Sequence, residues 1–387
     1  MNKIKIGFFI SLFGLIALSC TEEQDAKLKD DVFNPLSFVD KLQKSACPDK
    51  RVCVFDIQQD SSTGIWQGEL SNAVAYKTIL EVFSENDIEH QIKLLPNNSI
   101  LEPYGLIRVS TAQLRGAAKH SSELVSQGLL GQPVRILKKE GDWFYVQLVD
   151  GYLGWIESLS ITPYSETALR AWNESERAFV LNKNLDVYNE QGQIITELVA
   201  ANVISLIGEP INEQQKIQLP DGQIGFTYYL QFLRASEWID MQPNPESIIG
   251  IAKTYMGIPY VWGGTSTKGF DCSGFTKNIF LLNGIQLPRD ASQQVQCGET
   301  IDTSNGFENL KQGDLLFFGK KASNNKKERI THVAIYLKNA SFIHASGEVK
   351  IQSLDPSSEI FAPDRLETFI RAKRISKDCI GTYAHKL

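Results

Sequence analysis

The hydrophobic positions between residues 106 and 162 alternate with polar ones in short runs, which is the period of half-buried β-strands. The run from Phe144 to Leu148 is the clearest example. Gly141-Asp142 precedes it and Asp150-Gly151 follows it, and both dipeptides are typical of tight turns. Short strands separated by such turns predict a small β-barrel for this segment.

Residues 163 to 240 show a weaker form of the same pattern. A short helix is predicted at residues 168–173, and strands follow it. The Asp221-Gly222 turn and the alternation after it resemble the turn at Asp150-Gly151. We therefore expect a second barrel of the same kind.

A different periodicity marks residues 35 to 105. Residues 71–83 carry apolar side chains at helical spacing, and residues 88–94 then alternate as a strand. The two elements predict a small α/β unit, to which the sequence assigns no chemistry. One side of its helix is expected to hold Val74, Tyr76, Ile79, Leu80 and Phe83.

The stretch around Cys272 combines a glycine-rich loop with the start of a helix. The loop is Pro259–Gly264, and the spacing of Phe275, Ile279 and Leu282 predicts an amphipathic helix after it. Cys272 therefore falls in the first turn, where unpaired N–H groups favour a thiolate and lower a thiol pKa. This position is typical of a nucleophile, whereas an isolated cysteine is more often a small buried hydrophobic residue.

Two of the five histidines of the chain lie on one predicted hairpin. Residues 331–337 and 341–345 alternate as strands, and they contain His332 and His344. A three-residue loop at residues 337–339 would place the two histidines directly opposite each other, whereas a two-residue turn at residues 339–340 would put them on opposite faces. We expect the three-residue loop, because a nucleophilic cysteine needs both imidazoles on one side.

Beyond these patterns, the C-terminal part resembles a known family. NlpC-type cell-wall peptidases, which are papain-like cysteine peptidases with a Cys-His-His triad, have six motifs that occur here in the same order: PYVWGG at 259–264, FDCSGF at 270–275, LPR at 287–289, GDLLFF at 313–318, THVAIY at 331–336 and FIHA at 342–345. The resemblance covers residues 245–387. It implies that Cys272 is the nucleophile, with His332 as general base and His344 holding the His332 ring. It also implies that the Tyr260 hydroxyl helps to bind the oxyanion.

The first barrel resembles a bacterial SH3-type (SH3b) domain through Gly141-Asp142-Trp143 and Gly151–Trp155. Two SH3b domains followed by an NlpC-type domain resemble the γ-D-glutamyl-L-diamino acid endopeptidases, also called dipeptidyl-peptidase VI. That resemblance implies a murein peptide with a free N-terminal L-alanine as substrate. The ammonium group of this alanine needs a counter-charge when it is buried, so carboxylates are expected beside it. Ala291 departs from the family pattern, in which a polar residue is expected. The substrate contacts implied are Glu123, Tyr152, Trp262, Asp271, Ser273, Asp290 and Ser292.

The first residues have the pattern of an export signal. Lys3 and Lys5 precede an apolar run from Ile6 to Leu18, which is shorter than the ~20 residues that a transmembrane helix needs. The run leads into Cys20 in a sequence that resembles a bacterial lipoprotein box. We therefore expect a signal peptide at 1–19 and a lipidated tether at 20–34, in a membrane-anchored protein of the cell envelope that faces the periplasm or the outside. Secretion with cleavage nearby is the alternative.

Composition limits the remaining possibilities. With 387 residues the chain is too long for one core, and its formal net charge of −6 does not suit a nucleic-acid partner. Setting the lipidated and the catalytic cysteine aside leaves four of the six cysteines, which allow three pairings. In an oxidising envelope we expect the disulfides Cys47–Cys53 and Cys297–Cys379. We expect a monomer that needs no metal and no other cofactor.

Together these patterns predict an α+β multidomain protein. Its units are a small α/β unit at 35–105, SH3b-like β-barrels at 106–162 and 163–240, and a papain-like NlpC-type catalytic domain at 245–387. The expected activity is hydrolysis of the γ-D-glutamyl–diamino acid bond of peptidoglycan-derived peptides. Three alternatives remain open: a hydrolase of stem peptides in intact peptidoglycan, a non-catalytic wall-binding lipoprotein and, as a minor one, an acyltransferase on the same papain-like scaffold. For the second barrel, wall binding and a spacer role are both open.

Overall fold

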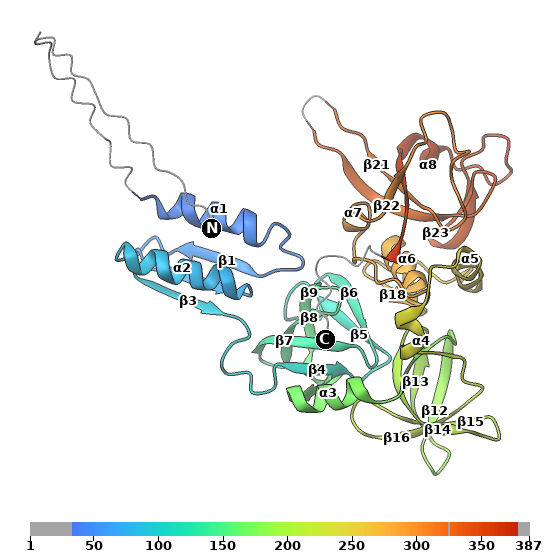
Figure 1. The fold of residues 1–387 in the computed structure, drawn as a ribbon, viewed down its shortest axis with the longest axis horizontal. Helices are drawn as coiled ribbons and strands as arrows, with labels where there is room; N and C mark the ends of the chain where they lie inside the picture. Colours follow the sequence, from blue (N-terminus) through green and yellow to red (C-terminus); the bar gives the residue numbers. More distant parts are fainter. Residues whose placement is uncertain (1–32, 324–325, 378–387) are drawn as a thin grey trace, which may run out of the picture.

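The computed structural model of the chain describes residues 33–323 and 326–377. They form a small unit of helices and strands, two seven-stranded sheets, and a C-terminal unit built on a six-stranded sheet (Figure 1). The predicted multidomain α+β fold is confirmed. The predicted signal peptide, Cys20, most of the tether and Cys379 lie outside the described residues, and so does the expected Cys297–Cys379 bond.

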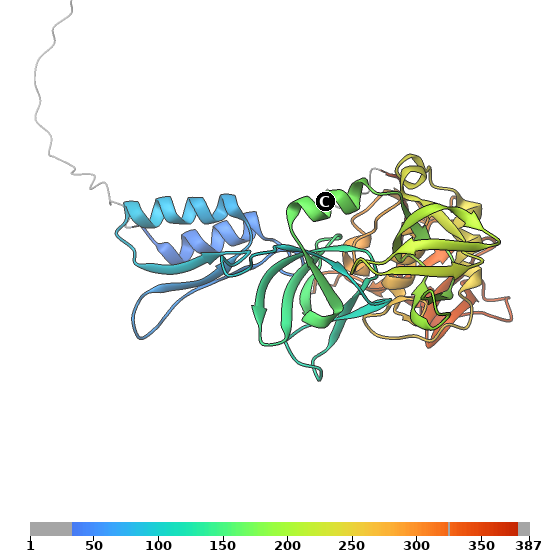
Figure 2. The same cartoon turned by 90° about the horizontal axis from the view of Figure 1, so that it is seen from below.

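The N-terminal unit packs two helices on one side of a three-stranded sheet (Figure 2). The first two strands pair antiparallel, and the second and third pair parallel, which requires a crossover through the second helix. That helix begins after Asn72, whose side chain accepts a hydrogen bond from the Ala75 N–H. The elements are α1 (Pro35–Ala46), β1 (Phe55–Gln59), β2 (Trp66–Leu70), α2 (Ala73–Glu85) and β3 (His90–Leu94).

The predicted helix at residues 71–83 is α2, but one residue of its predicted apolar side is wrong. Ala75, Ile79 and Phe83 are buried, whereas Val74 is 77% exposed. The buried positions repeat every four residues from Ala75, and Val74 lies about a quarter of a turn outside that row. The apolar face is therefore narrower than the sequence pattern indicates.

The two seven-stranded sheets have the same topology. The strand order is β10-β4-β7-β8-β9-β5-β6 in the first and β17-β11-β14-β15-β16-β12-β13 in the second, so each strand has a counterpart in the other sheet. This agreement confirms the predicted second SH3-like domain. The first sheet contains β4 (Tyr104–Ile107), β5 (Thr111–Arg115), β6 (Leu124–Leu129), β7 (Pro133–Glu140), β8 (Trp143–Leu148), β9 (Leu153–Glu157) and, after η1 (Ser158–Ser160), β10 (Ile161–Tyr164). The second follows α3 (Glu166–Glu174) and contains β11 (Arg177–Val180), β12 (Asn184–Tyr188), β13 (Ile194–Val199), β14 (Val203–Ile211), β15 (Gln214–Gln218), β16 (Ile224–Tyr228) and β17 (Phe232–Arg234).

The C-terminal unit is an antiparallel sheet with helices packed against it. The strand order is β20-β25-β21-β22-β23-β24, and one helix, α6, packs on β22 and β23. Phe275 of that helix shares a buried apolar cluster with Phe317 and Ile343 of the sheet. The elements are α4 (Ala235–Asp240), α5 (Pro245–Thr254), β18 (Thr265–Ser266), β19 (Gly269–Phe270), α6 (Cys272–Leu281), α7 (Ala291–Gln294), β20 (Glu299–Ile301), β21 (Leu315–Lys320), β22 (Arg329–Tyr336), β23 (Ser341–Ser346), β24 (Glu348–Ser353), α8 (Pro363–Thr368) and β25 (Phe369–Arg374).

Helix α6 has the predicted apolar and polar sides, but it is buried on all sides, so its polar side does not face solvent. Every residue of the helix is buried, including Lys277 and Asn278. Lys277 forms an ion pair at 3.2 Å with Asp150 of the first SH3-like sheet. Asn278 accepts a hydrogen bond from the Tyr255 hydroxyl at 3.1 Å. The polar side of the helix is thus covered by the first SH3-like unit and by the residue after α5.

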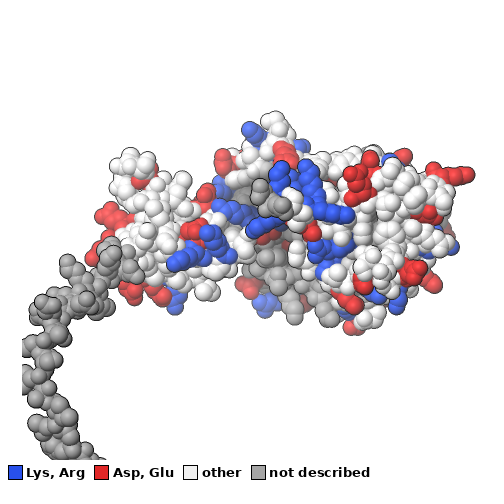
Figure 3. All heavy atoms as spheres, turned by 90° about the horizontal axis from the view of Figure 1, so that it is seen from above, with Lys and Arg blue, Asp and Glu red and all other residues white. Residues whose placement is uncertain are grey.

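The surface mixes both signs of charge. On the face drawn in Figure 3, basic side chains gather near the middle of the molecule and acidic ones are spread over both ends. Within residues 33–323 and 326–377, none of the helices has the length and apolar character that a membrane span requires.

Candidate active site

The start of α6 fixes the position of Cys272. Asp271 precedes the helix, and its side chain accepts a hydrogen bond from the Gly274 N–H at 2.7 Å. The glycine-rich loop lies directly against this turn, because a Cβ atom on Gly274 would be 2.0 Å from the Gly264 carbonyl oxygen. Glycine is therefore required at position 274, and Cys272 is the first residue of the helix, as predicted.

The Cys272 thiol lines a cavity, although only 8% of the residue is exposed. Burial, and after it the Asp271 carboxylate, raises the pKa of the thiol to about 12. Hydrogen bonds from the backbone N–H groups of Val333 and Ser273 act in the opposite direction. The predicted lowering of this pKa is therefore wrong for the structure, because the loss of water around the sulfur outweighs the N–H groups at the helix start.

His332 on β22 and His344 on β23 form a hydrogen-bonded pair. Nε2 of His332 lies 2.7 Å from Nδ1 of His344, and the two rings are nearly perpendicular at 87°. The backbone N–H of Val333, the next residue along β22, is close enough to Cys272 to lower the pKa of its thiol. Cys272 at the start of α6 therefore lies beside β22, the strand that carries His332.

The hairpin that carries the histidines has a different register from the one predicted. Ile335 pairs with Ile343, and the Leu337 N–H donates to the Ser341 carbonyl oxygen. The three-residue loop is thus 338–340 rather than 337–339, because Asn339 and Ala340 both adopt positive φ. Moving the loop by one residue shifts the pairing by two positions, so the histidines stay on one face as diagonal neighbours.

Gln352 on β24 continues this hydrogen-bond chain, and no sequence pattern indicated it. Its side-chain oxygen Oε1 lies 2.8 Å from His344 Nε2. Because an amide oxygen only accepts, His344 carries its proton on Nε2, and its Nδ1 accepts the proton of His332 Nε2. His332 Nδ1 is then unprotonated, which is the state that a general base requires.

Both imidazoles are held neutral. Burial lowers the pKa of His332 well below 6.5, and the charge of Arg365 lowers it further. Burial and Arg365 lower the pKa of His344 to about 3, although the hydrogen bond to Gln352 acts in the opposite direction. The resting site therefore contains a thiol and a neutral imidazole, and the proton has to move to His332 as the sulfur attacks.

The cavity above Cys272 has a volume of about 750 Å³, within the range of sites for small molecules. Most of its wall residues come from the first SH3-like unit and from the C-terminal unit, and Arg51 of the N-terminal unit also lines it. Burial and the neighbouring Cys272 raise the pKa of Tyr260 to about 12, so its hydroxyl remains a donor. The predicted substrate contacts all line this cavity: Glu123, Tyr152, Trp262, Asp271, Ser273, Asp290 and Ser292.

The two carboxylates predicted to meet an ammonium group differ in their surroundings. Asp271 is buried and accepts five hydrogen bonds, from the Gly263 and Gly274 N–H groups, the Ser273 hydroxyl and two nitrogens of Arg289. A carboxylate has about four lone-pair sites, so Asp271 is saturated. Glu123 is exposed at the cavity and accepts a hydrogen bond from Trp262 Nε1 at 2.8 Å. Glu123 is the acid that suits a ligand cation.

Sequence reasoning missed two arginines at this site. Arg289 is 1% exposed, pairs with Asp271 at 2.5 Å and donates to the Ser126 hydroxyl of the first SH3-like sheet. Arg51 comes from the N-terminal unit and lies 2.7 Å from Asp290. The LPR motif contains Arg289 and could have indicated it. Arg51 has no such signal, because 239 residues separate it from Asp290.

Comparison with known proteins matches two parts of the chain to family descriptions. Residues 257–366 match the NlpC/P60 family, and residues 114–161 match the bacterial dipeptidyl-peptidase Sh3 domain. Cys272, His332 and His344 all lie inside the first range.

Two curated relatives and one solved structure cover most of the chain's length. A γ-D-glutamyl-L-lysine dipeptidyl-peptidase of Bacillus cereus is 30% identical over 279 residues, which are 66% of this chain and 76% of the relative. Dipeptidyl-peptidase 6 of Lysinibacillus sphaericus is 29% identical over 259 residues, which are 64% of this chain and 90% of the relative. The crystal structure of an NlpC/P60 family protein from Bacillus cereus superposes with a TM-score of 0.61 at 26% identity, covering 70% of this chain and 99% of that one.

Proposed function

This chain belongs to the NlpC/P60 family of cysteine peptidases, and we propose that it hydrolyses the γ-D-glutamyl–diamino acid bond of peptidoglycan peptides with a free N-terminal L-alanine. The observation that carries the proposal is the cavity in which Cys272 lies. Glu123 and Tyr152 of the first SH3-like sheet form one of its walls. A cavity closed in this way suits the end of a short peptide better than the middle of a long chain.

The reaction begins with attack of Cys272 Sγ on the γ-carbonyl carbon of the D-glutamyl residue. His332 Nδ1 takes the thiol proton during this step, because the resting thiol and imidazole are both neutral. The electron pair of the carbonyl moves to its oxygen. The Cys272 backbone N–H and the Tyr260 hydroxyl are the donors that stabilise this oxyanion.

The tetrahedral intermediate then loses the diamino acid. His332 gives its proton to the departing amine, the C–N bond breaks, and a thioester joins L-Ala-γ-D-Glu to Cys272. Water attacks the thioester carbonyl carbon while His332 takes one of its protons. The C–S bond then breaks, which releases L-Ala-D-Glu, and His332 returns the proton to Cys272 Sγ. His344 and Gln352 keep His332 in the tautomer that both steps need.

The free amine of the substrate is recognised by Glu123 and Tyr152. An ammonium group that enters a partly closed cavity requires a counter-charge, which the Glu123 carboxylate supplies. The Tyr152 hydroxyl adds a hydrogen bond. An alanine that is acetylated or still joined to muramic acid lacks the charge and needs more room, so the site disfavours it on both counts.

Hydrolysis of L-Ala-γ-D-Glu-diaminopimelate and of its N-acetylated form tests this proposal. We expect kcat/KM to be about a hundredfold higher for the free peptide, since acetylation removes a charge-assisted hydrogen bond and leaves polar groups unpaired. Glu123→Gln should reduce this ratio through KM. Glu140→Gln, on an exposed residue of the same sheet, should leave it unchanged. Equal rates for both peptides would contradict the amine site and favour a hydrolase of intact stem peptides.

We also propose that the protein is a lipoprotein of the cell envelope, anchored through Cys20. Its support is the lysine-flanked apolar run that ends at this cysteine. Cys20→Ala should move the protein from the membrane fraction of its host to the soluble fraction. A variant that stays in the membrane fraction would contradict the anchor.

A further inference from the structure

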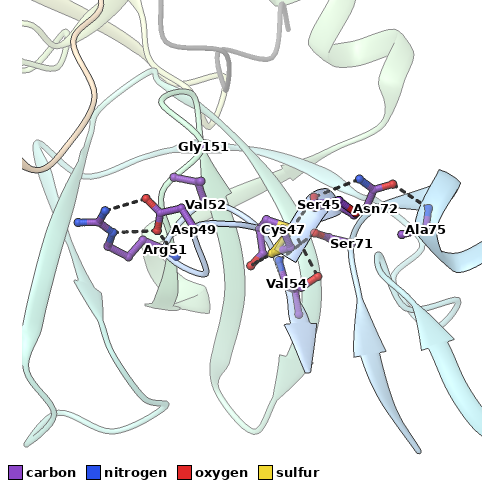
Figure 4. Close-up of a disulfide and its surroundings, with 12 residues drawn as sticks. Ser45, Cys47, Asp49, Arg51, Val52, Val54, Ser71, Asn72, Ala75 and Gly151 are labelled. Carbon is purple, nitrogen blue, oxygen red and sulfur yellow. Dashed lines mark hydrogen bonds and ion pairs between the residues drawn. A yellow bond between two sulfur atoms is a disulfide. The ribbon is translucent and has the colours of Figure 1, made fainter. Parts of the chain in front are cut away.

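The disulfide Cys47–Cys53 closes a loop of the N-terminal unit (Figure 4), and Arg51 of this loop lines the active-site cavity. This bond is one of the two predicted pairings and is confirmed. The loop contains Asp49 and Arg51, and Nε and Nη2 of Arg51 donate to the two carboxylate oxygens of Asp49 at 2.9 and 2.7 Å. A bidentate contact of this kind fixes the plane of the guanidinium group.

The same loop is seated on the first SH3-like sheet. Val52 is 5% exposed and belongs to the apolar core of that sheet. Gln147 Nε2 donates to the Val52 carbonyl oxygen at 2.8 Å, and the Leu153 N–H donates to the Arg51 carbonyl oxygen at 2.8 Å. The disulfide and these contacts together hold the loop in place relative to the cavity.

The tip of the loop contacts the C-terminal unit at the start of α7. Arg51 Nη1 donates to Asp290 Oδ2 at 2.7 Å and to the Ser292 hydroxyl at 2.9 Å. Gln293 Nε2 donates to Asp49 Oδ2 at 2.8 Å. Asp290 Oδ2 also accepts the Tyr152 hydroxyl at 3.2 Å. Three units of the chain thus meet at one carboxylate of the cavity wall.

We propose that the loop Cys47–Cys53 is a third wall of the substrate cavity, and that Arg51 positions Asp290 and Ser292 at the end that receives the free amine of the peptide. This inference rests on the proposed function. Arg51 itself lines the cavity, and 40% of its side chain is exposed. The N-terminal unit is then a determinant of substrate affinity rather than a spacer.

Charge explains why an arginine is needed at this place. Asp49 and Asp290 both lie within hydrogen-bond distance of Arg51, so the guanidinium group links two acids that would otherwise repel each other. Asp290 keeps its orientation toward Tyr152 only while that repulsion is compensated. A lysine has the charge but lacks the planar fork that spans three partners, so it should replace Arg51 in part.

The test is steady-state kinetics of the full mature chain with L-Ala-γ-D-Glu-diaminopimelate and its N-acetylated form. Arg51→Ala should raise KM for the free peptide by about ten- to a hundredfold, the range for loss of one charge-assisted hydrogen bond, with kcat within about twofold. Arg51→Lys should lie between this variant and the wild type. The double variant Cys47→Ser/Cys53→Ser should raise KM in the same direction, because it opens the loop and leaves Cys272 intact.

Lys44→Ala is the matched control. Lys44 is another cation of the N-terminal unit; 73% of its side chain is exposed, and it pairs with Asp40 of its own helix at 2.6 Å. KM should not change in this variant. Unfolding midpoints of all variants show whether the N-terminal unit still packs against the other units.

The outcomes separate this inference from the proposed function. A wild type that prefers the free peptide, together with unchanged KM in Arg51→Ala, overturns the role of the loop alone. The role of the loop is also overturned if Arg51→Ala loses both its folded state and its kcat, and Arg51→Lys does not restore them. A wild type with equal rates on both peptides contradicts the amine site, while a rise of KM for both peptides in Arg51→Ala would still support the third wall. A wild type that cleaves neither peptide overturns both.

Discussion

The proton on each nitrogen of His332 and His344 is set by a side chain that takes no part in the chemistry. Gln352 presents an acceptor to His344 Nε2 at 2.8 Å, and His344 in turn accepts from His332 at 2.7 Å. This order leaves one nitrogen of His332 free for the thiol proton. Burial keeps both rings neutral, so the tautomer rather than the charge decides whether the base is competent.

Replacing Gln352 by leucine removes the acceptor and keeps a similar volume. His332 then populates both tautomers, and we expect kcat to fall by about tenfold or more while KM stays nearly constant. Gln352→Glu keeps the acceptor and should retain activity. Its negative charge raises the pKa of His344. Steady-state kinetics over a range of pH measures both variants, and an unchanged kcat in the leucine variant would show that His344 needs no such partner.

The pH dependence of kcat/KM follows from the His332 environment. His332 accepts a proton only when it is neutral, and its pKa is lowered well below 6.5, mainly by burial and then by Arg365. Activity should therefore persist as the pH falls through 6.5, and the acid limb should lie below that value. Arg365→Leu removes a neighbouring positive charge and should move the limb to higher pH. A wild-type limb at or above 6.5 would contradict a buried neutral base.

For the helices and strands, the sequence predicted the type and position of each element better than the residues that pack against it. The strands of the histidine hairpin were placed correctly, because alternation is a local signal. Their register was off by two positions, since nothing in the pattern shows that Asn339 and Ala340 adopt positive φ. Helix α6 was also placed correctly, but its polar side faces another unit rather than solvent.

The ion pair between Lys277 of α6 and Asp150 makes this burial testable. The two side chains are 10% and 1% exposed. Lys277→Ala leaves a buried carboxylate without its partner, so we expect the free energy of unfolding to fall by roughly 3–5 kcal/mol. Lys268→Ala breaks the more exposed pair with Glu197, in which the two side chains are 46% and 35% exposed. This change should lower the free energy of unfolding by about 0–1 kcal/mol. Urea unfolding compares the two variants, and equal losses would contradict a buried interface.

The cavity lies where separate units of the chain meet. The sequence could identify each unit by itself but not the contacts between the units. The motifs around Cys272, His332 and Tyr260 predicted the candidate catalytic side chains, because each motif is short and local. The resemblance placed Glu123 and Tyr152 on a second unit, and the structure brings both to the cavity. The contribution of the N-terminal unit depends on contacts across more than two hundred residues, such as the 239 between Arg51 and Asp290, and no local pattern records those.

We propose that Cys272 attacks a peptide whose free amine lies against the first SH3-like sheet. Detection of the covalent intermediate tests both parts of this proposal at once. The measurement is intact and peptide mass spectrometry of the enzyme, acid-quenched during turnover of L-Ala-γ-D-Glu-diaminopimelate. We expect an L-Ala-γ-D-Glu thioester on Cys272, absent in Cys272→Ala and far weaker with the N-acetylated peptide. Turnover with the acyl group on another residue, or equal labelling by both peptides, would contradict it.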